Sequence, residues 1–262
     1  MVHSRVTRLA GIASLCAIPL LFASLAPAQD KEPTADEIVA KHIDARGGAD
    51  KMKALKTAKI TGKMVMMGGQ MEAPFTLTIA RPFAMRMEME IQGKSLVQAF
   101  DGTTAWMINP FMGGNDPEKM SEEDSQQMRD DADFDGPLVD YKTKGHTVDL
   151  VGKEDVEGTS CYKLKIAKKT GKTDYSFIDA QSFLEIKSIT KQKMMGQEME
   201  MEVYPTNYKP VAGVLTPFTT ERKSGGRSVM TMTFDKVEPN IAVDEAKFKF
   251  PAKEEKAKEE KK

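Results

Sequence analysis

The stretch FAMRMEMEI, residues 83–91, places an apolar side chain at every second position. Successive side chains of a β-strand point to opposite faces of the sheet. Met85, Met87 and Met89 would therefore share one face, and the charged residues between them would share the other. Residues 199–203 and 230–234 repeat this alternation, with Glu or Thr between the apolar side chains. The pattern predicts several strands of a sheet with one wet face and one methionine-rich face.

Similar alternation extends over most of the chain and predicts a mainly β domain of the α+β class. Glycine-containing turns such as Gly68-Gly69, Asp101-Gly102 and Gly225-Gly226 separate the alternating segments. The candidate strands are residues 59–67, 72–81, 83–91, 94–100, 103–109, 146–151, 160–168, 172–179, 183–191, 197–204, 213–222 and 227–238.

Short helices are predicted outside these strands. The first begins at Thr34 or Asp36, which are good N-cap residues, and ends at Gly47. A second, over residues 50–55, leads into the first strand. An acidic helix is expected over residues 118–131, because an Asp-Pro pair precedes it at a position suited to a helix start. It lies between two runs of strands, where it could cover an open sheet.

The first 28 residues have the features of a cleaved signal peptide. Arg5 and Arg8 precede an apolar stretch over residues 11–25, and Ala26-Pro27-Ala28 has the small residues that a signal peptidase accepts. The apolar stretch falls short of the roughly 20 residues of a membrane-spanning helix. We therefore expect a soluble, secreted periplasmic protein that begins near Gln29, without an acyl group on Cys16.

Charge and cysteine content narrow the classes of function. The chain has 38 Lys and Arg against 39 Asp and Glu, and cleavage would remove two basic residues, leaving a net charge of about −3. Without a basic excess, we expect no nucleic-acid partner. Cys161 would be alone after cleavage, so no intramolecular disulfide is expected, and no base and orienting group mark it as a nucleophile. Residues 29–252 are expected to form one domain, and residues 253–262, all Lys, Glu or Ala, a solvated tail.

Nineteen methionines gather largely on predicted strand faces. Methionine is unbranched and polarizable, so it suits an apolar surface that must adapt to variable cargo. The alternative is an ordinary core in which methionine fills irregular gaps. Trp106, the only tryptophan, could stack on cargo or anchor the core. The expected cavity residues are Phe75, Leu77, Ile79, Met85, Met87, Met89, Trp106, Met199, Met201, Met230, Met232 and Phe234.

Three segments carry a family resemblance: residues 78–83 (TIARPF), 101–111 (DGTTAWMINPF) and 244–250 (DEAKFKF). In sequence, order and spacing they resemble the periplasmic lipoprotein carrier LolA and its relatives. Residues 45–48 (ARGG) resemble the broader set of outer-membrane lipoprotein-sorting proteins. The resemblance implies an unclosed antiparallel half-barrel with short covering helices, which open for the acyl chains of a lipoprotein. The run of Met and Glu over residues 194–204 and the charged tail depart from the family pattern.

Arg81 lies on the apolar side of the alternation, with Phe75, Leu77 and Ile79. A charge on that face needs polar partners. By resemblance, Arg81 matches the arginine whose hydrogen bonds to lid-helix carbonyls hold the empty carrier closed, so we expect a latch. The alternative is an arginine that extends from the strand end into water.

The resemblance implies a monomeric carrier of lipoproteins or lipids, with sorting proteins of the inner and outer membranes as partners. No enzyme motif is found, and we expect no catalytic residue, no metal site and no cofactor. A first alternative is a periplasmic copper protein, because thioethers are soft ligands and Met-x-Met pairs recur, although they are dispersed over many strands. A second is a lipid sensor or scaffold on the same half-barrel, because fold does not fix function.

Overall fold

The computed structural model describes Met1 and residues 32–112, 114–194 and 197–251. The expected signal peptide after Met1, the expected start at Gln29, Cys16 and the charged tail at residues 253–262 lie outside the described residues. A compact unit begins at Pro33.

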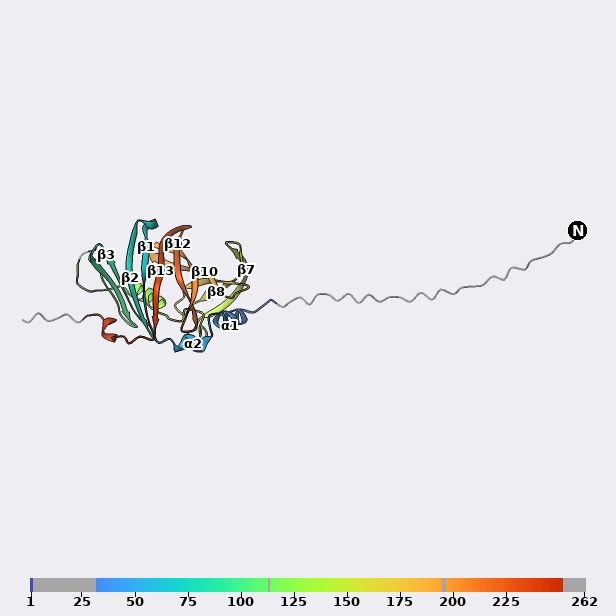
Figure 1. The fold of residues 1–262 in the computed structure, drawn as a ribbon, viewed down its shortest axis with the longest axis horizontal. Helices are drawn as coiled ribbons and strands as arrows, with labels where there is room; N and C mark the ends of the chain where they lie inside the picture. Colours follow the sequence, from blue (N-terminus) through green and yellow to red (C-terminus); the bar gives the residue numbers. More distant parts are fainter. Residues whose placement is uncertain (2–31, 113, 195–196, 252–262) are drawn as a thin grey trace, which may run out of the picture. The chain divides into compact units, whose positions relative to one another are not determined.

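Thirteen strands of the described residues form one antiparallel sheet, in the order β6-β5-β4-β3-β2-β1-β13-β12-β11-β10-β9-β8-β7. β1 pairs with both β2 and β13, so the first and last strands lie side by side in the middle of the sheet. β6 and β7 remain at the two ends, and the curved sheet is not closed (Figure 1). The predicted half-barrel of the mainly β class is therefore confirmed. The strands are β1 Thr57–Met66, β2 Met71–Ala80, β3 Ala84–Ile91, β4 Lys94–Asp101, β5 Ala105–Ile108, β6 Glu118–Lys119, β7 Thr147–Val156, β8 Thr159–Ala167, β9 Thr173–Asp179, β10 Glu185–Met194, β11 Gln197–Val211, β12 Val214–Ser224 and β13 Arg227–Pro239.

Several predicted boundaries were wrong. β7 ends at Val156 rather than at residue 151, and β10 is Glu185–Met194 rather than residues 183–191. β11 continues to Val211 although Pro205 and Pro210 read as strand breakers, and both prolines lie within the register with β12. The acidic helix, α3, is Glu122–Asp131 rather than residues 118–131. Ser121 is its N-cap and its hydroxyl accepts a hydrogen bond from the Asp124 backbone N–H at 3.1 Å. The preceding residues instead form β6, which pairs with β5.

Helices α1 (Ala35–Ala45) and α2 (Ala49–Ala54) precede the sheet and cover part of one face, here called the inner face. Thr34 and Glu37 form a capping box at the start of α1, as the N-cap signal predicted. Ile38 and Val39 of α1 are buried against Leu164 of β8 and its neighbours. Such burial of an apolar helix face contributes most of the stability of a short helix.

Gly47, at the junction of α1 and α2, explains why glycine follows α1. Its φ is +117°, and a Cβ there would lie 2.2 Å from the Gly213 backbone oxygen. The backbone carbonyl of the adjoining Arg46 accepts a hydrogen bond from the Leu215 N–H at 2.8 Å. The junction is thereby fixed to the turn between β11 and β12.

Helix α3 covers another part of the inner face. Met128 and Ala132, at its C-terminal end, pack into the cluster formed by β1–β5 and β13. On the other side, Lys168, which directly follows β8, pairs with Asp130 at 3.0 Å and with Asp174 of β9 at 2.5 Å. The expectation that this helix covers the open sheet is confirmed.

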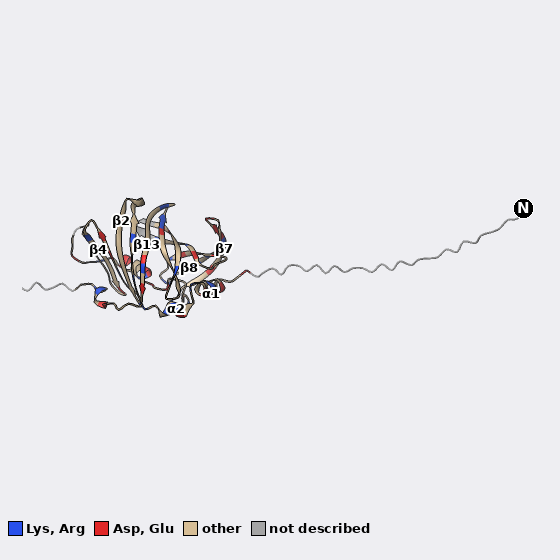
Figure 2. Ribbon diagram, in the orientation of Figure 1, with Lys and Arg blue, Asp and Glu red and all other residues tan. Residues whose placement is uncertain are grey.

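Charged residues of both signs are distributed over the strands (Figure 2). None of the helices in the described part of the chain is long and apolar enough to cross a membrane.

Candidate functional site: a methionine-lined inner face under a helical lid

The inner face of β1–β4 and β13 carries one methionine-rich cluster. Strand register brings Met64 opposite Met232, and Met66 opposite both Met71 and Met230. The cluster contains nine of the twelve expected cavity residues: Phe75, Leu77, Ile79, Met85, Met87, Met89, Met230, Met232 and Phe234.

The middle of this cluster is densely packed. Met64 is 2% exposed, and Phe75 and Met232 are also buried. The ring of Phe75 meets that of Phe234 edge-on, with centroids 6.0 Å apart. An acyl chain could enter only by displacing these side chains, and methionine can rearrange at low cost because its side chain is unbranched.

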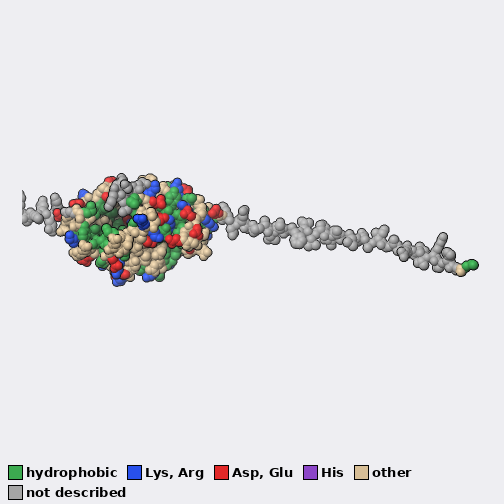
Figure 3. Space-filling model, turned by 90° about the horizontal axis from the view of Figure 1, so that it is seen from above, with side chains coloured by type: hydrophobic (Ala, Val, Ile, Leu, Met, Phe, Trp, Pro, Cys, Tyr) green, Lys and Arg blue, Asp and Glu red, His purple; other side chains and the backbone are tan. Residues whose placement is uncertain are grey.

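A pocket of about 840 Å³, here called the rim pocket, lies where the β1–β2 and β12–β13 hairpins turn. Its size falls within the roughly 300–1,000 Å³ of typical ligand pockets. Figure 3 looks onto this end of the sheet and shows a hollow lined by hydrophobic side chains. Five methionines and two arginines contribute to the lining: Met66, Met67, Met71, Met201, Met230, Arg222 and Arg227.

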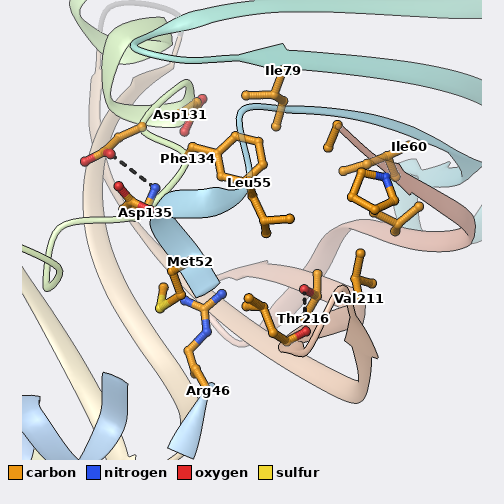
Figure 4. Close-up of a pocket in the computed structure, with 15 residues that line it drawn as sticks. Arg46, Met52, Leu55, Ile60, Ile79, Asp131, Phe134, Asp135, Val211 and Thr216 are labelled. Carbon is orange, nitrogen blue, oxygen red and sulfur yellow. Dashed lines mark hydrogen bonds between the residues drawn. The ribbon is translucent and has the colours of Figure 1, made fainter. Parts of the chain in front are cut away.

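A second, smaller pocket of about 160 Å³, here called the inner pocket, lies beneath α2. Figure 4 shows Met52 and Leu55 from the α2 segment and Phe134 from the loop after α3, near Ile60 and Ile79 of the sheet. The inner pocket and the rim pocket share no lining residue. The inner pocket is therefore separate from the rim pocket, and it lies beneath a lid formed by α1, α2 and the loop after α3, residues 132–146.

Arg81 joins the sheet to this lid. Its Nε donates to the Leu55 carbonyl at 2.6 Å and its Nη2 to the Met52 carbonyl at 2.9 Å. Both nitrogens Nη1 and Nη2 also donate to the Asp135 carboxylate, each at 2.6 Å. The guanidinium further stacks over the ring of Phe134, 5.1 Å from its centroid. The side chain of Arg81 is 21% exposed, so it does not extend freely into water.

The pairing with Arg81 also fixes the charge of Asp135. Burial alone raises the pKa of the Asp135 carboxyl, but the hydrogen bonds and charge of Arg81 outweigh burial and hold this pKa below its ordinary value. The carboxylate is thus ionised at neutral pH and forms a bidentate pair with the guanidinium.

Further contacts hold the loop after α3, residues 132–146, against α1 and α2. Lys53 of α2 pairs with Asp140 at 2.6 Å, and Lys142 pairs with Asp36 of α1 at 2.7 Å. Val139 is buried with Met52. We call α1, α2 and this loop the lid, and Arg81 links it to the inner face.

The expectation that Trp106 lines the cavity was wrong. Ala105, not Trp106, faces the inner cluster, because neighbouring side chains of β5 alternate between faces. Trp106 is 1% exposed on the outer face, where its Nε1 donates to the Phe248 carbonyl at 2.8 Å and its ring meets Phe250 edge-on. It anchors the C-terminal segment to the sheet, in line with the alternative interpretation.

Two remaining expected cavity residues, Met199 and Met201, lie on β11. Met201 is buried and lines the rim pocket. Met199 is 37% exposed, near the β10–β11 hairpin, and is not among the residues packed in the inner cluster. The Met199 side chain is exposed because it lies close to the start of β11.

Cys161 is fully buried, and its Sγ lies 3.4 Å from the Thr159 carbonyl. Burial, together with nearby carboxylates including Asp179, raises the pKa of this thiol to about 11. The thiol stays protonated at neutral pH. In the described part of the chain, no group of three His, Cys, Asp or Glu side chains is placed to hold a metal.

The copper hypothesis depended on whether the methionines converge, and the register does bring Met66, Met71 and Met230 together. However, Arg222 and Arg227 line the same pocket. Two guanidinium charges oppose the binding of a cation. The rim pocket therefore suits an apolar or anionic ligand better than Cu(I).

Sequence reasoning missed Asp135 and Arg222. Asp135 lies 54 residues from Arg81 within a polar interval, so no local pattern connects the pair. Arg222 could have been found, because it alternates with Phe218 and Val214 and hence shares the apolar face of β12. The adjacent charges of Glu221 and Lys223 obscured this alternation.

An unclosed sheet with an apolar inner face, short covering helices and an arginine bonded to helix carbonyls defines a lidded half-barrel. Comparison with solved structures finds the same fold in a LolA superfamily protein from Nitrosomonas europaea, with a TM-score of 0.57, 11% identity and coverage of 83% of this chain and 98% of that chain. A DUF1329 family protein from Desulfovibrio piger gives a TM-score of 0.57 at 11% identity, covering 82% and 97% of the two chains. A putative outer membrane lipoprotein-sorting protein domain from Vibrio parahaemolyticus gives 0.51 at 11% identity, covering 80% and 94%. No protein-family model and no curated protein matches the chain. The chain thus has the LolA-like fold.

Proposed function

We propose that the protein is a periplasmic carrier that holds the acyl chains of lipoproteins, or other apolar cargo, against its methionine-rich inner face for sorting to the outer membrane. Two of the structural neighbours are a LolA superfamily protein and an outer membrane lipoprotein-sorting domain, which supports this class of cargo. Partners would be the cargo itself and sorting proteins of the inner and outer membranes. The signal peptide would direct export, and its cleavage would leave a chain that starts near Gln29.

The observation that carries this proposal is the bonding of Arg81 to the carbonyls of Met52 and Leu55. An arginine on an apolar face is costly unless it has polar partners, and here the lid supplies them. When the lid opens, these hydrogen bonds break and the inner face becomes accessible. Apolar cargo offsets this cost by burying its own surface, about 0.8 kcal/mol per methylene.

A displacement assay tests acyl-chain binding. The neutral apolar dye N-phenyl-1-naphthylamine is expected to fluoresce on binding, and an N-palmitoylated peptide is expected to displace it while the same peptide without palmitate does not. Met87→Glu combined with Met201→Glu should suppress both signals, because a carboxylate at position 87 lies unpaired among apolar groups at a cost of several kcal/mol, and one at position 201 occupies the rim pocket beside Arg222. Both positions contact the methionine-lined surfaces described above.

Met112→Glu is the control for this assay, because Met112 is 84% exposed. It should leave dye binding and displacement unchanged. Circular dichroism should confirm that each variant is folded. Normal displacement in the folded double variant would contradict cargo binding on this face.

The localisation has its own test. N-terminal sequencing of the exported protein should give a chain that starts near Gln29 and carries no lipid. An uncut apolar stretch or an acylated Cys16 would refute it.

A further inference from the structure

Arg222 has no described partner for one of its buried donors. Its Nε is buried and makes no hydrogen bond within the part of the chain that the structure describes. A buried charged donor without a partner costs free energy of folding. Such a group in a natural protein calls for an unidentified partner.

The strand register places Arg222 within the methionine-lined rim pocket. Arg222 lies opposite Met230 of β13 and Val203 of β11, so it points to the inner face. Met230 in turn lies opposite Met66 of β1. One cationic group is therefore surrounded by apolar side chains.

A second unpartnered polar atom lies on the same face. The hydroxyl of Thr190 on β10 is buried and makes no hydrogen bond. Thr190 lies opposite Met201, another residue of the rim pocket.

The charged residues at the rim pocket indicate that the missing partner of Arg222 is an anion. Arg227, exposed on the β12–β13 hairpin, adds a second positive charge at the same pocket. Asp131 at the end of α3 interacts electrostatically with Arg222 but forms no ion pair with it, and its carboxylate instead accepts a hydrogen bond from Gln127. A planar guanidinium matches the two oxygens of a carboxylate or phosphate.

We propose that the rim pocket binds an anionic amphiphile, with its carboxylate or phosphate headgroup at Arg222 and its acyl chain among Met66, Met71, Met201 and Met230. This inference rests on the proposed carrier function and specifies the chemistry of the cargo. Arg227 at the rim would attract the headgroup, and Arg222 would bind it.

Three ligands that share one C18 chain separate charge from apolar binding: oleate, oleoyl lysophosphatidate and oleyl alcohol. The wild-type protein should bind one or both of the anionic ligands at least about tenfold more tightly than the alcohol, the effect of one charge-assisted hydrogen bond or more. Which anion binds more tightly distinguishes a carboxylate from a phosphate headgroup. Arg222→Met should reduce the preference to within about threefold and leave the affinity for oleyl alcohol unchanged.

Lys223→Met is the matched control. Lys223 is the next residue, points to the other face and lies near Glu157 and Glu221. It should preserve the preference for the anionic ligands. Arg222→Lys, which keeps the charge without the planar geometry, should give an intermediate preference.

Equal wild-type affinity for the three ligands would overturn the inference, and this result requires no variant to fold. An unchanged preference in folded Arg222→Met would overturn the assignment to Arg222. Failure of all three ligands and of the palmitoylated peptide to bind would instead contradict the proposed carrier function itself.

Discussion

Replacing Arg81 by leucine tests the latch directly. The variant removes two charge-assisted hydrogen bonds to the carbonyls of Met52 and Leu55. At roughly 1.5–3 kcal/mol each, they stabilise the closed lid by about 3–6 kcal/mol relative to the open one. A shift of this size between closed and open states raises the affinity for a ligand that needs the open state. We expect Arg81→Leu to bind the palmitoylated peptide at least about tenfold more tightly.

Asp135 complicates this variant, because its side chain is 10% exposed and would lose its cationic partner. Removing one partner of a buried ion pair typically lowers the free energy of unfolding by about 3–5 kcal/mol. The double variant Arg81→Leu with Asp135→Asn removes this unpaired carboxylate. If the two variants agree in affinity, the change comes from the carbonyl hydrogen bonds rather than from the unpaired charge.

The assay measures both uptake and delivery. Affinity is taken from displacement of the neutral dye, and delivery from transfer of the peptide to phospholipid vesicles, after circular dichroism has confirmed the fold. Transfer should become slower, because lid closure no longer helps to expel the cargo. Unchanged affinity together with unchanged transfer would refute the latch and leave Arg81 a purely structural residue.

Three further predictions concern stability and reactivity. Burial lowers the folded-state pKa of His42, which hydrogen-bonds the Phe183 carbonyl, from 6.5 to about 4. Its contribution to the free energy of unfolding is therefore fully present above pH 6.5 and is lost as the pH falls from 6.5 toward 4. Between pH 7 and 5.5 the free energy of unfolding should fall by about 1 kcal/mol more in wild type than in His42→Leu, and parallel pH profiles in chemical denaturation would disprove this. Cys161 should react with a thiol reagent only on unfolding, and rapid labelling of the native protein would contradict its burial in the native fold. Gly47→Ala should lower the free energy of unfolding by at least about 2 kcal/mol, because its φ is positive and the methyl would meet the Gly213 oxygen; Gly158→Ala, also at positive φ but in open space, should cost less.

The strands and their inner face could be predicted because alternation is a local property. Met85, Met87 and Met89 form one cluster, as the period of two required. Alternation alone does not say which of two apolar faces lies inside, and Trp106 was assigned to the wrong one. Its face depends on the C-terminal segment near Phe248, which returns from 142 residues away. The predicted start of α3 was wrong for a local reason, because Ser121 caps the helix instead of the earlier Asp-Pro pair.

Arg81 shows what the sequence can and cannot supply. Its place on an apolar face followed from alternation, and its carbonyl partners from family resemblance, but the bidentate partner Asp135 needed the folded chain. Long-range pairs of this kind join segments that have no periodic relation. The same limit applied to Arg222, whose environment arises from β11 and β13 on either side.

The magnitudes of lid closure and cargo burial constrain how such a carrier works. Burying about ten methylenes at about 0.8 kcal/mol each gives about 8 kcal/mol. Opening the lid against the two carbonyl hydrogen bonds of Arg81 costs about 3–6 kcal/mol, and displacing Met64 and Met232 adds to that cost. The surplus is therefore a few kcal/mol, which permits both binding and release. Without Arg81 the cost of opening falls to that of displacing the packed methionines, so more of the burial free energy remains as affinity and the cargo is released more slowly.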